Sequence, residues 1–182
     1  MRVITGSRRG KKLKTLDTFD TRPTTDMVKE AVFSAIQFDV PGAKVLDLFA
    51  GSGQMGIEAL SRDASHCVFV DNNPAAVQVI KENISDCKLT NESRVLNMDS
   101  LDYLKVAKGQ FDIVLLDPPY NKGLIDKVMN SIDPYLSDRA IVVCEHEKEL
   151  EPAEEYGRLK KHKRYKYGKI AVTIYKIPTE ED

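Results

Sequence analysis

The sequence predicts an α/β protein built around a parallel β-sheet. Short apolar runs alternate with amphipathic segments through the middle of the chain, a pattern typical of successive strand–helix–strand units. A glycine-rich turn follows the first of these runs, and acidic residues stand at the ends of three later ones. The 182 residues are 42% hydrophobic and 30% charged, which suffices for one core and excludes collagen-like, low-complexity and largely disordered classes.

The first elements can be assigned in chain order from periodicity and capping residues. Residues 1–5 and 11–15 predict a basic β-hairpin around the turn at residues 6–10. Thr25 is placed to cap a helix, whose apolar positions are expected to form one buried stripe. That stripe consists of Met27, Val28, Ala31, Val32 and Ile36. Strands are expected at residues 44–49, which is a buried-strand run, and at 67–70, 94–97, 111–116 and 140–144.

Helices are expected between these strands, and a hairpin after them. Asn73 followed by Pro74 is typical of a helix start, because the asparagine can cap and proline suits the first helical position. Asp99 and Ser100 can cap another helix that runs through residue 107. Further helices are expected from residue 55 to about 62 and over residues 124–132. Residues 158–167 and 169–176 alternate around Gly168 and predict a hairpin, with 170, 172 and 174 on one face.

Charge is distributed unevenly along the chain, although the net charge is only −1. Residues 1–14 hold six Lys and Arg and no acid, and residues 158–169 hold seven and no acid. The remaining residues therefore carry a net charge near −14. An acidic body with two basic patches is typical of a protein that binds a polyanion at one place. Tyr165 and Tyr167 interleave with the second patch and favour a nucleic acid.

Several other classes of protein find no support in the sequence. No apolar run approaches the roughly 18 residues of a membrane span, and no apolar signal core follows the N-terminus, so we expect a cytoplasmic protein without a membrane partner. Three widely spaced cysteines and three histidines show no ligand spacing, so we expect buried, reduced cysteines and no metal site.

The first chemical motif is the glycine-rich turn at residues 51–56. Gly51, Gly53 and Gly56 fit the pattern G-x-G-x-x-G, and Asp71 follows Gly51 by 20 residues at the end of the next strand. The glycines let the backbone approach a nucleotide-like ligand, and an acid at the second strand end can accept hydrogen bonds from a ribose diol. This pattern allows either a dinucleotide or S-adenosylmethionine. Asp47, just before the turn, would lie opposite a positively charged amino or sulfonium group of the ligand, which favours S-adenosylmethionine.

A second acid at a strand end adds to this site. Asp99 could accept the amino group of adenine, although a carboxylate there is also a common helix cap. The most specific motif is Asp117-Pro118-Pro119-Tyr120, directly after the fourth strand. Asp117 and a backbone carbonyl in the rigid proline turn can accept both N–H bonds of an exocyclic amine and orient its lone pair. Tyr120 offers a stacking surface for a base removed from its neighbours.

With these motifs in this order, the chain resembles the class I S-adenosylmethionine-dependent methyltransferases that act on exocyclic amines. The narrower resemblance is to the RsmD family, the bacterial 16S ribosomal RNA (guanine-N2)-methyltransferases. It covers residues 2 to about 175 and rests on RVITGSRRGKKL, TRPTTDMVKEAVFSAI, LDLFAGSGQMGIEALSR, FVDNNPAAVQVIKENI, FDIVLLDPPY and YGKIAVTIY. One departure is Gln54-Met55, where relatives commonly have smaller residues.

The resemblance implies a Rossmann-like, seven-stranded sheet with helices on both faces. It also implies a basic hairpin extension at residues 1–20, a methyltransferase domain at 21–178 and a frayed tail at 179–182. The implied cofactor is S-adenosylmethionine, and the implied substrate is 16S rRNA within the small ribosomal subunit. The cofactor residues are then Asp47, Phe49, Gly51, Gly53, Asp71, Asn72, Asp99 and Ser100.

For the substrate, the resemblance assigns Asp117, Pro118, Pro119 and Tyr120 to the target guanine. Arg8, Arg9, Lys11, Lys12, Arg22 and Thr24 would contact the RNA. We expect direct in-line methyl transfer with no covalent enzyme intermediate, since no cysteine or histidine is placed as a nucleophile.

Three alternatives remain at this point. A methyltransferase acting on adenine N6 or another amine of RNA or DNA would use the same turn, although a DNA enzyme usually needs a separate recognition domain. A nicotinamide oxidoreductase would leave Asp117–Tyr120 and both basic patches unexplained. A non-catalytic RNA binder in ribosome assembly would have no need for the filled catalytic positions.

Overall fold

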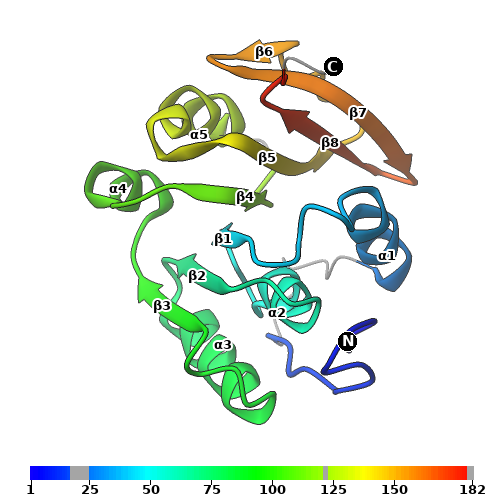
Figure 1. Ribbon diagram of the computed structural model, residues 1–182, viewed down its shortest axis with the longest axis vertical. Coiled ribbons are helices and arrows are strands. Elements are labelled where there is room, and N and C mark those ends of the chain that lie inside the picture. Colours follow the sequence, from blue (N-terminus) through cyan, green and yellow to red (C-terminus); the bar gives the residue numbers. More distant parts are fainter. Residues whose placement is uncertain (17–24, 121–122, 180–182) are drawn as a thin grey trace.

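The computed structural model describes residues 1–16, 25–120 and 123–179, which form one central sheet between helices (Figure 1). The strand order is β3-β2-β1-β4-β5-β8-β7-β6. β1 to β5 run parallel, and β8, β7 and β6 continue the sheet antiparallel beyond β5. The strands are β1 Lys44–Leu48, β2 His66–Asp71, β3 Ser93–Asn97, β4 Phe111–Leu116, β5 Leu136–Glu147, β6 Glu155–Tyr156, β7 Leu159–Tyr167 and β8 Ile170–Lys176.

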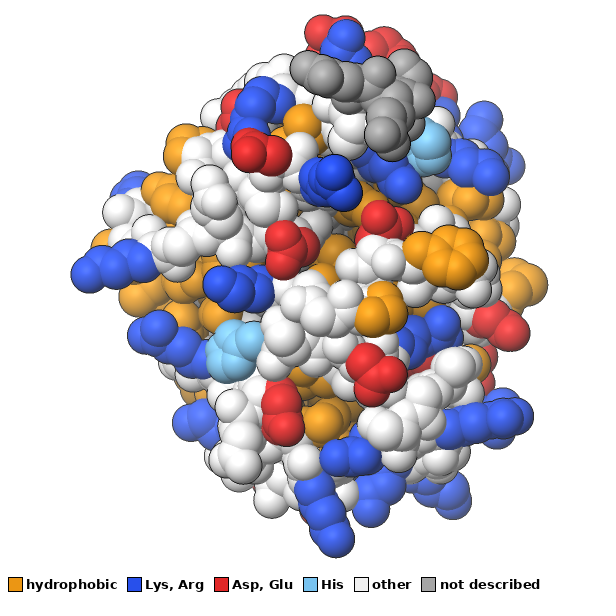
Figure 2. Space-filling model, in the orientation of Figure 1, with side chains coloured by type: hydrophobic (Ala, Val, Ile, Leu, Met, Phe, Trp, Pro, Cys, Tyr) orange, Lys and Arg blue, Asp and Glu red, His pale blue; other side chains and the backbone are white. Residues whose placement is uncertain are grey.

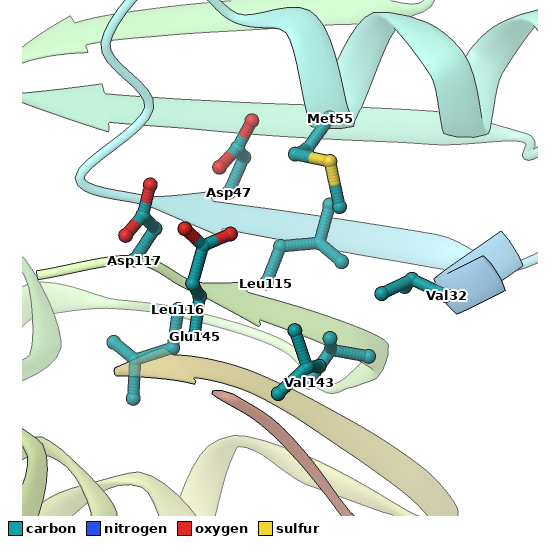
Figure 3. Close-up of a pocket in the computed structure, with 9 residues that line it drawn as sticks. Val32, Asp47, Met55, Leu115, Leu116, Asp117, Val143 and Glu145 are labelled. Carbon is teal, nitrogen blue, oxygen red and sulfur yellow. The ribbon is translucent and has the colours of Figure 1, made fainter. Parts of the chain in front are cut away.

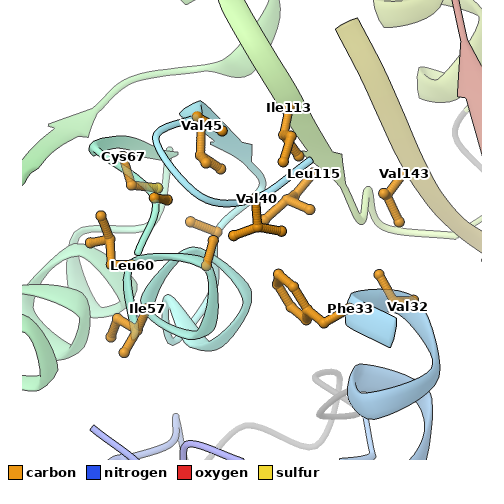
Figure 4. Close-up of a cluster of buried hydrophobic side chains, with 14 of the residues drawn as sticks. Val32, Phe33, Val40, Val45, Ile57, Leu60, Cys67, Ile113, Leu115 and Val143 are labelled. Atoms are coloured by element: carbon orange, nitrogen blue, oxygen red, sulfur yellow. The ribbon is translucent and has the colours of Figure 1, made fainter. Parts of the chain in front are cut away.

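Five helices cover the two faces of the sheet in these parts of the chain. They are α1 Asp26–Ala35, α2 Gln54–Ser61, α3 Pro74–Asp86, α4 Ser100–Val106 and α5 Leu124–Ile132, and a 3-10 turn follows at Asp133–Tyr135. α1, α2 and α3 share one buried apolar cluster with the sheet, and α4 and α5 share a second cluster on the opposite face. Figure 4 shows the first cluster, in which Phe33 of α1 and Ile57 of α2 lie beside strand residues such as Val45.

The caps predicted from the sequence are confirmed. The Thr25 side chain accepts a hydrogen bond from the backbone N–H of Val28, and Asn73 accepts one from that of Ala75. Each cap satisfies a donor that the first helical turn leaves without a partner in the helix.

Three expectations about the fold are corrected. The described sheet has eight strands rather than seven, because Glu155–Tyr156 pairs with the beginning of β7. Met27 is 63% exposed and lies outside the buried stripe of α1, where Phe33 is buried instead. β5 runs from Leu136 to Glu147 rather than over 140–144 alone; β8 has 170, 172 and 174 on one face as predicted, and its other face is buried too because the strand lies inside the sheet.

The N-terminal hairpin, residues 1–14, is a loose version of the expected one. It holds a single antiparallel bridge between Arg2 and Lys12 rather than two strands. Val3 and Leu13 are nevertheless buried in the cluster of α1, α2 and α3. The hairpin therefore packs onto the main core, and the predicted boundary between residues 20 and 21 lies outside the described residues.

A buried carboxylate fixes this hairpin to the helices. Glu58 on α2 has no exposed surface, and its oxygens accept hydrogen bonds from the backbone N–H groups of Ile4 (2.8 Å) and Thr5 (3.0 Å). The same carboxylate pairs with Arg62 at 2.9 Å and with the buried Lys29 of α1 at 3.6 Å. Hairpin and helices are thus joined through one side chain.

The described residues contain no helix long and apolar enough to cross a membrane. They also contain no group of three or more His, Cys, Asp and Glu arranged around a metal position. The three cysteines are free and buried, as predicted from their spacing.

Candidate active site

A pocket lies at the carboxyl ends of β1, β4 and β5, and three acidic side chains face it (Figure 3). They are Asp47 of β1, Asp117 directly after β4, and Glu145 of β5. The apolar wall comes from the helix side, through Val32 of α1 and Met55 of α2. The site is therefore assembled from residues that are far apart in the sequence.

The sheet register explains how these carboxylates meet. Leu48 of β1 is level with Leu116 of β4, which is level with Cys144 of β5. Asp117 and Glu145 each come one residue later, so they lie at the same height along two adjacent parallel strands. Sequence reasoning identified Asp47 and Asp117 but missed Glu145. The available signal was an acid directly after the apolar run at 140–144, the same arrangement that drew attention to Asp117.

The environment of Asp47 and Asp117 disfavours the negative charge of both side chains. Burial raises the pKa of Asp47 to about 8, with a further contribution from the charge of Asp71, while the N–H of Gly56 opposes the shift by donating a hydrogen bond at 3.0 Å. Burial also raises the pKa of Asp117 well above its usual range, and the negative charges of Glu145 and Asp47 add to the effect. A cation brought into this pocket would relieve the repulsion.

The glycine-rich turn lies beside the pocket, between β1 and α2. Gly51 and Gly53 adopt positive φ values of 58° and 78°, a region that favours glycine. A Cβ built on Gly51 would meet nothing within 4 Å, so the turn is open to a ligand there. Gly56 has another role, because its Cβ would lie 2.3 Å from the ring of Phe69, so this glycine allows α2 to approach β2.

The predicted ribose and adenine acids lie on neighbouring strands. One oxygen of Asp71 accepts a hydrogen bond from the N–H of Gly51 at 2.8 Å, so the carboxylate at the end of β2 contacts the glycine-rich turn. Asp99 follows β3, and one of its oxygens accepts from the backbone N–H groups of Leu101 and Asp102. The helix-cap role of Asp99 is thus confirmed, alongside its position at the same sheet edge.

The remaining predicted cofactor residues flank this edge. Phe49 has a φ of 59°, unusual for a residue with a side chain, and begins the turn after β1. Asn72 is exposed after β2, and Ser100 is buried at the first position of α4. The side-chain Oε1 of Gln54, at the start of α2, is buried and has no hydrogen-bond partner among the described residues.

The turn after β4 follows Asp117 directly. Pro118 is buried, Pro119 is exposed and Tyr120 is half-buried. The next two residues lie outside the described part, and α5 begins at Leu124.

The predicted RNA contacts on the N-terminal hairpin are only partly available. Arg9, Lys11 and Lys12 are exposed. Arg8 is half-buried instead, and its guanidinium donates a 2.6 Å hydrogen bond to the backbone oxygen of Cys87 after α3. Arg22 and Thr24 lie outside the described residues.

Four of the seven basic side chains in the second patch pair with acids that lie before it in the sequence. Arg158 pairs with Asp133 at 2.7 Å and with Asp138 at 3.1 Å. Lys160, Lys161 and Arg164 pair with Glu155, Glu154 and Glu151, in that order. Figure 2 shows Lys and Arg gathered low in the view, around the N-terminal hairpin and α3, and again at the upper right over β7 and β8. The two patches therefore lie toward opposite ends of the sheet.

Comparison with known proteins gives consistent matches over nearly the whole chain. The family model described as Conserved hypothetical protein 95 matches residues 1–176. The YlbH protein of Bacillus subtilis, a proposed rRNA methyltransferase, is 41% identical over 97% of this chain and 98% of its own. Ribosomal RNA small subunit methyltransferase D of Escherichia coli is 33% identical over 96% of this chain and 89% of its own. The solved structure of yhhF, a proposed methyltransferase from Escherichia coli, is 33% identical, covers 97% of both chains and superposes with a TM-score of 0.87.

Proposed function

This chain is a methyltransferase that belongs to the RsmD family, and on that premise we propose that it methylates the exocyclic N2 amine of a guanine in 16S ribosomal RNA of the small subunit. The observation that carries this proposal is Asp117, which leaves the parallel sheet within a Pro-Pro-Tyr turn and faces a pocket shared with Asp47 and Glu145.

S-adenosylmethionine is the methyl donor that this edge would hold. The open backbone at Gly51 would admit the amino-acid part, Asp71 would accept hydrogen bonds from the ribose hydroxyls, and Asp99 would accept one from the adenine amino group. The buried Oε1 of Gln54 is an acceptor without a partner beside the turn. Once bound, the cofactor supplies an electrophilic methyl group attached to a positively charged sulfur. Asp47 gives this cation a favourable environment.

Asp117 is the residue that would prepare the target amine. An exocyclic amine is a weak nucleophile because its lone pair is delocalised into the ring. When the Asp117 carboxylate and a backbone carbonyl of the proline turn accept its two N–H bonds, the lone pair points at the methyl group. The carboxylate also stabilises the positive charge that develops on nitrogen as the C–N bond forms.

The proton released from the amine has a local acceptor in this proposal. Burial and the neighbouring Glu145 raise the pKa of Asp117, and a carboxylate with a raised pKa is a stronger base. The N–H bond breaks after methyl transfer, its electron pair stays on nitrogen, and Asp117 takes the proton. Tyr120 would stack on the flipped guanine.

Phosphates of the RNA would lie on the N-terminal hairpin. Arg9, Lys11 and Lys12 are exposed there, and the Glu58 carboxylate holds the backbone that carries them. Arg8 remains part of this proposed surface, with its guanidinium already engaged at α3. Arg22 and Thr24 stay predictions from the sequence.

The proposal is tested by methyl transfer from labelled S-adenosylmethionine to small subunits that lack the modification, with naked 16S RNA and DNA in parallel. N2-methylguanosine from the subunits is the expected product. N6-methyladenosine, or label in DNA, would retain the roles of the pocket but contradict the substrate.

A matched pair of variants then tests the assignment of Asp117. Asp117→Asn should keep affinity for S-adenosylmethionine and lose methyl transfer by at least about a hundredfold. Asp112→Asn alters the same residue type in β4, where Asp112 accepts from the N–H of Lys44 at the amino end of the strand, and should retain activity. Equal activity of the two variants would contradict the proposed role of Asp117.

A further inference from the structure

The pocket wall continues onto the C-terminal hairpin formed by β7 and β8. Glu145 of β5 stands opposite Val172 of β8, and Val172 stands opposite Tyr165 of β7. Directly opposed residues of antiparallel strands share one face of a sheet. Both Glu145 and Val172 line the pocket. Tyr165 is therefore in the same row, two strands from Glu145, which corresponds to about 10 Å at the usual strand spacing.

Tyr165 is one of two half-buried aromatic side chains that form a small ledge here. The rings of Tyr165 and Tyr167 are stacked, with centroids 6.3 Å apart and an angle of 22° between their planes. Both pack against the apolar cluster on the side of α1 to α3, the side from which Val32 and Met55 face the pocket. The Nζ of Lys163 lies 5.2 Å from the ring centroid of Tyr165. A cation is thus held at one end of a flat aromatic surface.

The basic side chains in and beside β7 fall into two groups, those with an acidic partner and those without one. The described structure gives acidic partners to Arg158, Lys160, Lys161 and Arg164. Lys163, Lys166 and Lys169 have no ion pair with any described residue, and all three are exposed. Lys163 shares the face of the two tyrosines, Lys166 alternates to the other face of β7, and Lys169 follows the turn after Tyr167, so the unbalanced positive charge lies along the end of the hairpin nearest the pocket.

We propose that Tyr165 and Tyr167, with Lys163, form a stacking ledge for an unpaired nucleotide that flanks the methylated base in single-stranded RNA. This inference rests on the proposed function and adds a second contact for its substrate. A base that leaves its stack for the pocket deprives its neighbour of a stacking partner. An aromatic ring can replace that partner regardless of base identity, and a lysine beside it can contact the adjoining phosphate. The combination of half-buried rings and lysines without an acidic partner in the described structure fits a nucleotide better than an apolar protein segment.

The test compares three substitutions that preserve packing to different degrees. Tyr165→Leu keeps an apolar side chain but removes the ring, and Tyr165→Phe keeps the ring. Tyr135→Leu is the matched control, since Tyr135 is also half-buried but packs against the other apolar cluster just before β5, at the opposite edge of the sheet. Thermal unfolding would establish that each variant is folded before any binding is measured.

The first readout is quenching of 2-aminopurine placed next to guanine in a six-nucleotide single-stranded RNA. The unsubstituted protein should quench it, and Tyr165→Leu should lose the quenching and bind roughly tenfold more weakly, while Tyr165→Phe and Tyr135→Leu behave as wild type. The second readout is methylation of unmodified small subunits. There Tyr165→Leu should raise KM for the subunit and leave kcat and KM for S-adenosylmethionine unchanged.

Two results would contradict the proposed stacking ledge. One is an absence of quenching by the unsubstituted protein, or equal quenching by Tyr165→Leu. The other is a KM effect on assembled subunits that is absent with naked RNA, which would indicate a protein contact. Failure of the proposed function would show differently, as no methyl transfer to RNA by the unsubstituted protein, and the quenching assay does not depend on methyl transfer.

Discussion

Replacing Glu58 by glutamine tests whether a buried charge holds the N-terminal hairpin in place. Lys29 and Glu58 are both fully buried, and the ammonium nitrogen lies 3.6 Å from the nearer carboxylate oxygen. At an effective dielectric constant of about 20, such a pair attracts by roughly 5 kcal/mol. Removing Glu58 leaves Lys29 buried without its counter-charge, with its Nζ still donating a hydrogen bond to the backbone oxygen of Arg2. Breaking a buried pair in this way typically costs about 3–5 kcal/mol. We expect Glu58→Gln to lower the free energy of unfolding by this amount.

Urea denaturation followed by circular dichroism would measure the loss. Burial lowers the pKa of Lys29 and the charge of Glu58 opposes that shift, so the lysine loses its proton more readily in the variant. The deficit relative to wild type should therefore shrink as pH rises, because a neutral lysine tolerates burial better. Lys29→Met combined with Glu58→Gln should cost less than the sum of the single changes. A loss below about 1 kcal/mol for Glu58→Gln alone would refute the reasoning.

Three further outcomes follow from other contacts. Affinity for S-adenosylmethionine should rise with pH toward 8, because burial raises the pKa of Asp47 to about 8 and this side chain must be ionised to attract a cation. Calorimetry should detect proton release on binding, and Asp47→Asn should remove the pH dependence of the affinity. Gly6→Ala should lower Tm more than Gly10→Ala, since both have positive φ but only the first places a Cβ 1.7 Å from the backbone oxygen of Ser61; equal losses would contradict the docking of the hairpin. Tyr156→Phe removes a hydroxyl that donates to a carboxylate on α5 and accepts from a backbone N–H. The free energy of unfolding should fall by roughly 1–3 kcal/mol, measured by thermal denaturation, and an unchanged Tm would show that these bonds are dispensable.

Local patterns predicted most of the parallel half of the sheet. The expected bounds of β4 and α5 are confirmed residue for residue, because a run that is apolar after Asp112 and an amphipathic repeat are properties of short segments. Met27 and Phe33 of α1 show where this reasoning fails. Helical periodicity allows both to be near one stripe, and only the neighbours supplied by the sheet decide which is buried.

The site was partly predictable for the same reason. Asp47 and Asp117 stand next to recognisable motifs, whereas Glu145 follows its apolar run without one, and its position beside Asp117 is established by the pairing of β5 with β4. Residues 158–169 contain no acid, so a count within that segment does not show that four of its basic side chains pair with acids that precede it. Arg158, for example, meets Asp133 and Asp138 only after the hairpin returns to the end of α5.

The late position of β8 has a consequence for biosynthesis. β5 ends at Glu147, but the strand that pairs with its open edge begins only at Ile170 and ends at Lys176. At about 5–20 residues per second, a growing chain carries this unpaired edge for roughly 1.5 to 6 seconds. Unpaired edges are templates for association with other chains. A translation product that ends before Val172 is thus expected to lack this part of the pocket wall and to aggregate through the open edge of β5. The strand that completes the pocket also covers that edge.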